Sequence, residues 1–223
     1  MNTEFSLDEL KIRNLQGELE DERDWRVKEF GLIKRLYEEI QKRNSDEELK
    51  AYTRMTIPII YAHWEGFCVS SFKYILKFIN NESLDHTVLT NNLFTYANKS
   101  VYDKLKGKQS FEQRCEFSEE FLKSLASSKL VLDTKINTKS NLNFEAFTEV
   151  CSVIGIDTNK FTQYSSDLTR MVNIRNSIAH GENSFLFELD QINKYITLVV
   201  ELMDTLLVEE YNFINEKKYM IAS

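Results

Sequence analysis

Helix-breaking residues are nearly absent from this chain, which has a single Pro and six Gly among 223 residues. An all-β sandwich or barrel needs a turn about every 8–12 residues, and turns rely heavily on these two residue types. The scarcity therefore favours long helices. With 42% hydrophobic residues the chain can also bury a core, so we expect an all-α fold in which residues 1–223 form a single domain.

Two long helices are predicted in the first third of the chain. Residues 6–43 carry apolar side chains at helical spacing among charged ones. A second helix is predicted over 45–79, where a Ser followed three residues later by Glu forms a capping-box pattern. The apolar face of this helix is predicted to include Met55 and Ile59. Pro58 is expected to kink it, because proline has no backbone N–H to donate.

Shorter helices are predicted in the second half of the chain, over residues 144–154, 164–180 and 190–213. The last of these has the clearest amphipathic pattern. Residues 80–143 are the least regular part, since polar clusters separate short helical pieces there. We therefore expect a bundle of long helices interrupted by a less ordered middle segment.

Charge is distributed unevenly along the chain. Its 28 basic and 35 acidic side chains give a net charge of −7, so the protein has no general basic coat for nucleic acid. Residues 51–140 nevertheless hold 12 basic and 9 acidic side chains, a net +3. Lys104, Lys106 and Lys108 concentrate this positive charge. They form either a solvated loop or a patch that contacts the phosphates of RNA.

The sequence gives no sign of export or of a membrane span. The N-terminus lacks the regions of a signal peptide, and no window approaches the roughly 18–20 apolar residues of a membrane helix. Cys68, Cys115 and Cys151 are far apart, which is typical of reduced thiols in the cytoplasm. The cysteines and histidines do not have the spacing of zinc ligands, and we expect no metal and no cofactor.

One predicted helix places an arginine in the middle of its apolar stripe. At about 100° per residue, six apolar or aromatic residues lie within about 60° of Arg175 on the helix. They are Tyr164, Leu168, Met171, Val172, Ile178 and Ala179. A guanidinium stays charged, and burying it without a partner is costly. The site must therefore supply a carboxylate, several carbonyl groups or a wet groove that an anion can enter.

His180 lies four residues after Asn176 on the edge of this stripe, and Gly181 is placed to end the helix. The partial negative charge of a helix C-terminus favours a protonated imidazole. An arginine that holds a phosphate and a histidine that moves a proton suit phosphodiester chemistry. Spacing alone leaves a structural interpretation open, in which Arg175 forms a buried ion pair and His180 only caps the helix.

The sequence around this helix resembles the HEPN superfamily, small α-helical domains of which many are metal-independent ribonucleases. Residues 175–182 (RNSIAHGE) match its R-x4-6-H motif, with Arg175 and His180 as the two defining residues. Further matches, in chain order, are 62–67 (AHWEGF), 140–144 (SNLNF), 155–157 (GID) and Leu168. Together they are similar to a prokaryotic nuclease-type branch associated with toxin and anti-phage defence systems. The resemblance spans about 25–207 without 83–139, which is a candidate insertion.

The resemblance implies a HEPN-like helical bundle and a homodimer in which two motif helices line one composite active site. Arg175 would stabilise charge on the phosphate, His180 would act as general base or acid, and Asn176 would help to position them. Attack by the ribose 2′-OH of an RNA substrate would leave 2′,3′-cyclic phosphate and 5′-OH ends. Such enzymes often serve as toxins or anti-phage effectors, and a partner protein holds them in check.

Glu65, on the second helix, is a candidate buried partner for Arg175. The alternative to a ribonuclease is a non-catalytic HEPN module that binds a partner protein or a nucleotide, because the R-N-x-x-A-H-G pattern also occurs in such proteins. A purely structural scaffold would require the motif match to be a coincidence. Replacing His180 separates the first two hypotheses, since a catalytic histidine is needed for cleavage and a structural one for stability.

Overall fold

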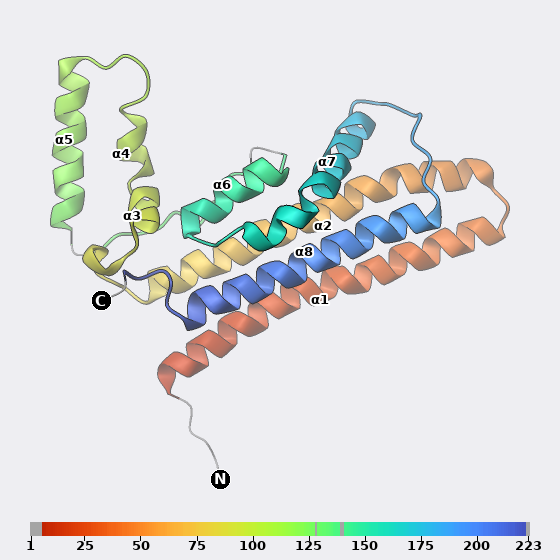
Figure 1. Cartoon of the computed structure of the whole chain (residues 1–223), viewed down its shortest axis with the longest axis horizontal. Helices are drawn as coiled ribbons and strands as arrows, with labels where there is room; N and C mark the ends of the chain where they lie inside the picture. Colours follow the sequence, from red (N-terminus) through yellow and green to blue (C-terminus); the bar gives the residue numbers. More distant parts are fainter. Residues whose placement is uncertain (1–5, 128, 139–140, 222–223) are drawn as a thin grey trace, which may run out of the picture.

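The computed structural model describes residues 6–127, 129–138 and 141–221, and its regular secondary structure is helical with no strand in that part of the chain (Figure 1). The expected all-α fold is confirmed. The helices are α1 (Leu7–Lys42), α2 (Asp46–Asn81), α3 (Asn91–Ala97), α4 (Lys99–Asp103), α5 (Phe111–Ala126), α6 (Phe144–Ile154), α7 (Ser165–Ala179) and α8 (Leu189–Asn215). Two short 3-10 turns, His86–Val88 and Asn159–Tyr164, lie between them.

The body of the molecule is made of α1, α2 and α8, which lie side by side (Figure 1). Each long helix begins where a polar side chain can cap it. The Ser6 hydroxyl accepts from the Glu9 N–H and the Glu9 carboxylate accepts from the Ser6 N–H, and Ser45 accepts from the Glu48 N–H. These contacts satisfy backbone donors that a helix start leaves open, which explains why the predicted starts agree with the structure.

The prediction for the buried face of α2 is wrong, because residues of the predicted apolar face are exposed. Met55 and Ile59 are 56% and 42% exposed, whereas Ile60 and Trp64 are fully buried. The physical reason is that α2 is apolar over most of its circumference. It packs against α1, α7 and α8 on different sides, so the spacing of its apolar residues does not indicate one buried face. The helix assignment is continuous through Pro58.

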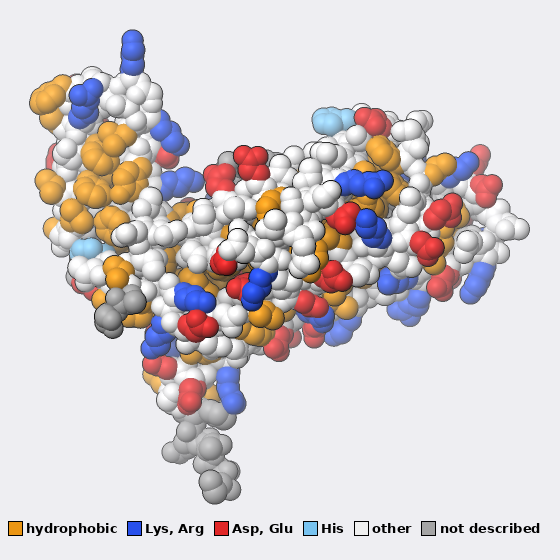
Figure 2. Space-filling model, viewed as in Figure 1, with side chains coloured by type: hydrophobic (Ala, Val, Ile, Leu, Met, Phe, Trp, Pro, Cys, Tyr) orange, Lys and Arg blue, Asp and Glu red, His pale blue; other side chains and the backbone are white. Residues whose placement is uncertain are grey.

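The middle segment is more regular than expected, because α5 is a full 16-residue helix. A capping box between Ser110 and Gln113 begins it. None of its residues is buried, and α5 stands away from the body together with α4 (Figure 1). Hydrophobic side chains gather on this part of the molecule (Figure 2), and on α5 the residues Phe111 and Leu122 are 81% and 64% exposed.

Residues 129–138 lead from α5 back to the body without regular secondary structure. The side-chain amide of Asn80, near the end of α2, bonds both the N–H and the C=O of Leu132, at 2.8 and 2.9 Å. The chain then reaches α6, which Asn143 caps, and α6 ends at Gly155 in the left-handed conformation with φ 95°. These contacts fix the segment across α2, close to the helix that carries the sequence motif.

Candidate active site

The motif helix α7 packs against α2, and all of its buried residues precede Arg175. Leu168, Met171 and Val172 are buried in the core. From Arg175 onward the same stripe opens toward solvent, since Arg175 is partly buried and Ala179 is exposed. The arginine therefore lies at the border between the core and the surface, where its charge remains partly hydrated.

Two neutral groups hold the Arg175 guanidinium. Its carbon lies 4.8 Å from the centroid of the Tyr61 ring, and Nη1 donates to the Asn176 side-chain oxygen at 2.9 Å. Among the described residues no carboxylate forms an ion pair with it. The contact with the ring is a cation–π interaction, which orients the guanidinium without neutralising it. The other N–H groups of the guanidinium are available to an anion.

Tyr61 comes from α2 and is 1% exposed. Its hydroxyl accepts a hydrogen bond from the Leu142 N–H at 2.7 Å. The pKa of Tyr61 is raised to about 12, mainly by burial and also by the neighbouring Glu65 carboxylate, while the Leu142 N–H and Arg175 act to lower it. The phenol therefore stays protonated at neutral pH and acts as a fixed support beneath the arginine.

Glu65 does not form the expected ion pair with Arg175. Its carboxylate instead accepts a hydrogen bond from the Thr138 hydroxyl at 2.7 Å, and it also interacts with the hydroxyl of Tyr61. The reason is its position one turn beyond Tyr61 on α2, where the Tyr61 ring lies against the guanidinium. Glu65 thus reaches Arg175 only through Tyr61, and its supporting role remains a prediction.

Asn176 connects the motif helix to the segment before α6. Its side-chain N–H group donates to the side-chain oxygen of Asn141 at 3.3 Å, while its oxygen accepts from Arg175. Three residues that precede α6 therefore contact the site, namely Thr138, Asn141 and Leu142. Both sides of the Arg175 support depend on that segment.

His180 lies at the end of α7 rather than inside it. Its backbone N–H donates to the carbonyls of Asn176 and Ile178, and its side chain is exposed. Gly181 follows with φ 91°, and the Glu182 N–H bonds the Ser177 carbonyl at 3.0 Å, which completes a Schellman-type helix end. His180 is five positions after Arg175, which corresponds to about 140° around the helix axis. Within one chain the two side chains thus point in different directions.

The three lysines predicted to contact phosphates are placed differently. Lys104 pairs with Glu120 at 2.5 Å, and Lys106 pairs with Asp103 at 2.7 Å. Lys108 is exposed and has no ion-pair partner in the described residues. Two of the three charges are therefore compensated, which weakens the patch as an isolated feature. Their binding of RNA remains a prediction.

The sequence did not single out Tyr61, Thr138 or Asn141 as functional. Two signals were present: Asn141 lies in the matched stretch 140–144, and Tyr61 and Glu65 are four residues apart, which places both on one face of a helix. His63, from the same matched stretch, packs between Trp25 and Phe30 and is 7% exposed. Burial lowers its pKa, which favours the neutral form. It faces α1 and does not touch the site.

The fold and the motif helix together define a HEPN domain. The family model described as RiboL-PSP-HEPN matches residues 21–207, and the chain belongs to that family. No curated protein and no solved structure matches the chain significantly. In the described part of the chain no group of three or more His, Cys, Asp or Glu side chains could hold a metal ion. No helix there is long and apolar enough to cross a membrane.

Proposed function

We propose that this protein is a metal-independent endoribonuclease with Arg175 and His180 as its catalytic residues. The observation that carries the proposal is the uncompensated charge of Arg175. Arg26 of the same protein, a structural arginine, is paired with a carboxylate, because its Nη1 lies 2.5 Å from the Glu22 carboxylate. Among the described residues Arg175 contacts the Tyr61 ring and the Asn176 amide but no carboxylate. Such an arrangement suits a guanidinium that awaits a phosphate.

The reaction follows from these groups. The ribose 2′-OH attacks the adjacent phosphorus, and His180 accepts the hydroxyl proton or delivers a proton to the leaving 5′-oxygen. Arg175 donates hydrogen bonds to the phosphate oxygens, which gain negative charge as the new bond forms. The products carry a 2′,3′-cyclic phosphate and a 5′-OH. DNA is inert because it lacks the 2′-OH.

The active site is composite and needs two chains. His180 is exposed and lies about 140° around α7 from Arg175, so one chain does not direct both groups at the same phosphate. A second motif helix brought alongside the first would supply the missing histidine. Homodimerisation is therefore part of the proposed mechanism.

A toxin or anti-phage effector in the cytoplasm, held in check by a partner protein, is the role that we infer from the resemblance. A net charge of −7 fits this role, because it opposes indiscriminate binding of RNA. Affinity would then come from a defined substrate or from local positive charge.

The test is RNA cleavage by the purified protein in excess EDTA, with the wild type beside His180→Ala. We expect the wild type to cut, to leave cyclic phosphate ends and to leave DNA of the same sequence intact. The variant is expected to keep its thermal unfolding midpoint and its dimeric mass while it loses cleavage. Glu182→Ala, an exposed change two residues further on, is the matched control and should cut normally.

Cleavage that disappears with EDTA, or that persists in His180→Ala, would contradict the proposal. Loss of stability in His180→Ala without any wild-type cleavage would favour the non-catalytic HEPN module. In that case the motif would serve binding or helix termination.

A further inference from the structure

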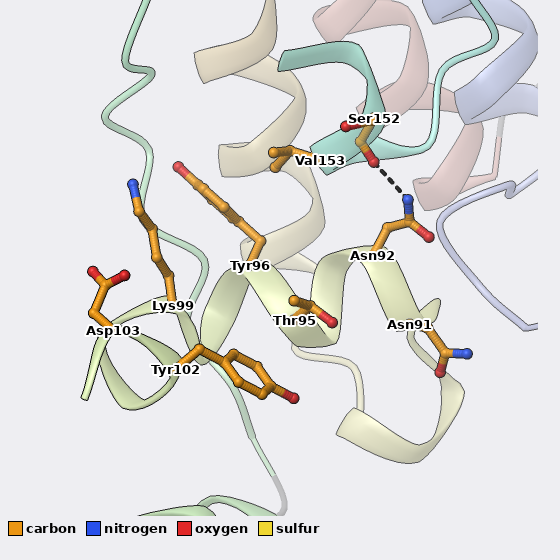
Figure 3. Close-up of a pocket in the computed structure, with 9 residues that line it drawn as sticks. All are labelled: Asn91, Asn92, Thr95, Tyr96, Lys99, Tyr102, Asp103, Ser152 and Val153. Atoms are coloured by element: carbon orange, nitrogen blue, oxygen red, sulfur yellow. Dashed lines mark hydrogen bonds between the residues drawn. The ribbon is translucent and has the colours of Figure 1, made fainter. Parts of the chain in front are cut away.

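A concave site lies between α3–α4 and α6, and residues 135–137 form part of its wall. It consists of two adjoining pockets of about 470 and 360 Å³. Tyr96, Lys99 and Val153 line both pockets, so the two are lobes of one cleft (Figure 3). Sites for small organic ligands in proteins typically measure about 300–1,000 Å³. The cleft has the size of a site for a small organic molecule.

Aromatic rings form much of the cleft wall. Tyr96 is partly buried and projects from α3 with its hydroxyl on the same side as the Lys99 ammonium (Figure 3). Tyr102 points the other way from α4, and its ring is braced by Phe117 and Phe121 of α5, with centroids at 6.1 and 6.0 Å. Fixed rings at an open cleft offer flat faces to a planar ligand.

Positive charge lies next to these rings. Lys99, Lys106 and Lys135 line the cleft, with Asp103 and Glu149 as its acidic side chains. Lys106 is bound to Asp103 at 2.7 Å, and Glu149 also has a partner. Lys99 and Lys135 are exposed and have no ion-pair partner among the described residues. These two ammonium groups can therefore receive an anion.

We propose that this cleft binds a nucleoside phosphate, with the base against the ring of Tyr96 and the phosphate between Lys99 and Lys135. The aromatic ring and the two ammonium groups suit a ligand that combines a planar ring system with an anion. A base can stack on an aromatic side chain, which strengthens binding in a way that a plain anion cannot. Lysine serves as a point charge for phosphate without demanding one geometry.

The cleft is joined to the candidate active site by the 129–138 segment. The Tyr96 hydroxyl donates to the Lys135 carbonyl at 3.3 Å, and three residues later Thr138 donates to Glu65. The Cα atoms of Lys135 and Thr138 are at most about 11 Å apart, because a residue spans no more than about 3.6 Å. The nucleoside phosphate is therefore either a free mononucleotide or one nucleotide of an RNA strand that continues toward Arg175.

The experiment measures binding by calorimetry, with AMP and with a short 2′-O-methyl oligoadenylate as separate probes. The methylated strand has no 2′-OH, so its binding is tested even if the protein cleaves no RNA. The test variant is K99E/K135E. The matched control is K28E/K129E, which makes the same change in net charge at two exposed lysines that do not line the cleft. Arg175→Gln separates this cleft from the candidate active site.

We expect K99E/K135E to weaken binding of AMP about tenfold or more and K28E/K129E to leave it within about twofold. AMP should bind more tightly than ribose 5-phosphate or adenosine, because only AMP offers both the base and the phosphate. Arg175→Gln should leave AMP affinity unchanged. Binding of AMP would identify a free nucleotide, and binding of the oligonucleotide alone, lost in K99E/K135E, would identify a nucleotide of a strand. Equal losses in both double variants, or no binding of either probe, would overturn the proposal.

Discussion

Two arginines of this protein differ in how the charge of the guanidinium is compensated. Arg26, on α1, is 4% exposed, and besides the Glu22 carboxylate it donates to the His63 carbonyl at 3.1 Å. Gly66 leaves room for it, since a Cβ there would lie 3.2 Å from its Nη2. Among the described residues, Arg175 has no carboxylate partner of this kind. The first arrangement fixes two helices together, and the second keeps a cation available at the surface.

Arg175→Lys tests whether the planar guanidinium matters as well as the charge. A lysine keeps the charge but loses the flat contact with Tyr61 and the parallel N–H groups. We expect cleavage to fall about 10²-fold, the size of effect found when one donor to a developing anion is removed. Rates under single-turnover conditions measure it. Arg170→Lys, an exposed change on the same helix, should cut like the wild type, and wild-type rates in both variants would contradict the assigned role.

Glu210 shows what an uncompensated carboxyl group does in the core. It lies on α8 with 0% exposure, and burial raises its pKa to about 8, an effect that the nearby Ser71 hydroxyl only partly offsets. The unfolded chain has the ordinary carboxyl pKa of about 4.3. Between these two values the unfolded state releases the proton first, so this residue lowers the free energy of unfolding progressively as pH rises.

Glu210→Gln removes this pH-dependent cost. We expect the stability gain of the variant over the wild type to grow by roughly 2 kcal/mol between pH 6 and pH 8. Urea unfolding at the two pH values measures it. Glu201→Gln, an exposed change on the same helix, should show no such growth. An equal gain for Glu210→Gln at both pH values would show that the carboxyl group does not titrate in this range.

At the scale of elements, helix ends could be predicted and helix faces only in part. The ends follow from local chemistry, such as Asn143 before α6 and the glycines Gly155 and Gly181 after α6 and α7. The apolar stripe of α7 could also be predicted, because polar residues flank it. The buried face of α2 could not be predicted, because a helix that is apolar on most sides does not indicate which side its neighbours cover, and Met55 is left 56% exposed.

Gly181→Ala tests the end of α7. Gly181 has φ 91°, a left-handed conformation that costs an L side chain about 1–2 kcal/mol. We expect a loss of stability of that order, together with reduced cleavage, because His180 directly precedes the turn. Thermal unfolding and cleavage rates provide the measurements. Gly17→Ala is the contrasting variant, since Gly17 lies inside α1 with open space around it and should gain up to about 1 kcal/mol. Unchanged stability in Gly181→Ala would contradict the argument.

At the scale of the whole molecule, the candidate site is assembled from segments far apart in the sequence. Tyr61 and Glu65 come from α2, Thr138 and Asn141 from the segment before α6, and Arg175 from α7. The motif could identify Arg175 and His180, since they share one helix. The support around Arg175 could not be predicted, because it depends on how 129–138 is laid across α2. That placement depends on tertiary contacts, which local sequence patterns do not indicate.

The composite site makes a prediction about mixed dimers. Arg175→Ala and His180→Ala should each abolish cleavage alone. A dimer with one chain of each kind retains an intact arginine from one chain and an intact histidine from the other. If a phosphate is held by Arg175 of one chain and served by His180 of its partner, mixing the two inactive proteins should restore part of the wild-type rate.

Light scattering must first show that the mixture contains dimers, and differently tagged chains must show that subunits have exchanged. The double variant R175A/H180A mixed with His180→Ala is the control, because none of the dimers in that mixture contains an intact histidine. Restored cleavage in the first mixture alone would establish sites shared between chains. Continued inactivity after confirmed exchange would place Arg175 and His180 of one chain in the same site, and the end of α7 would then have to rearrange when RNA binds, since about 140° separates the two side chains around the helix.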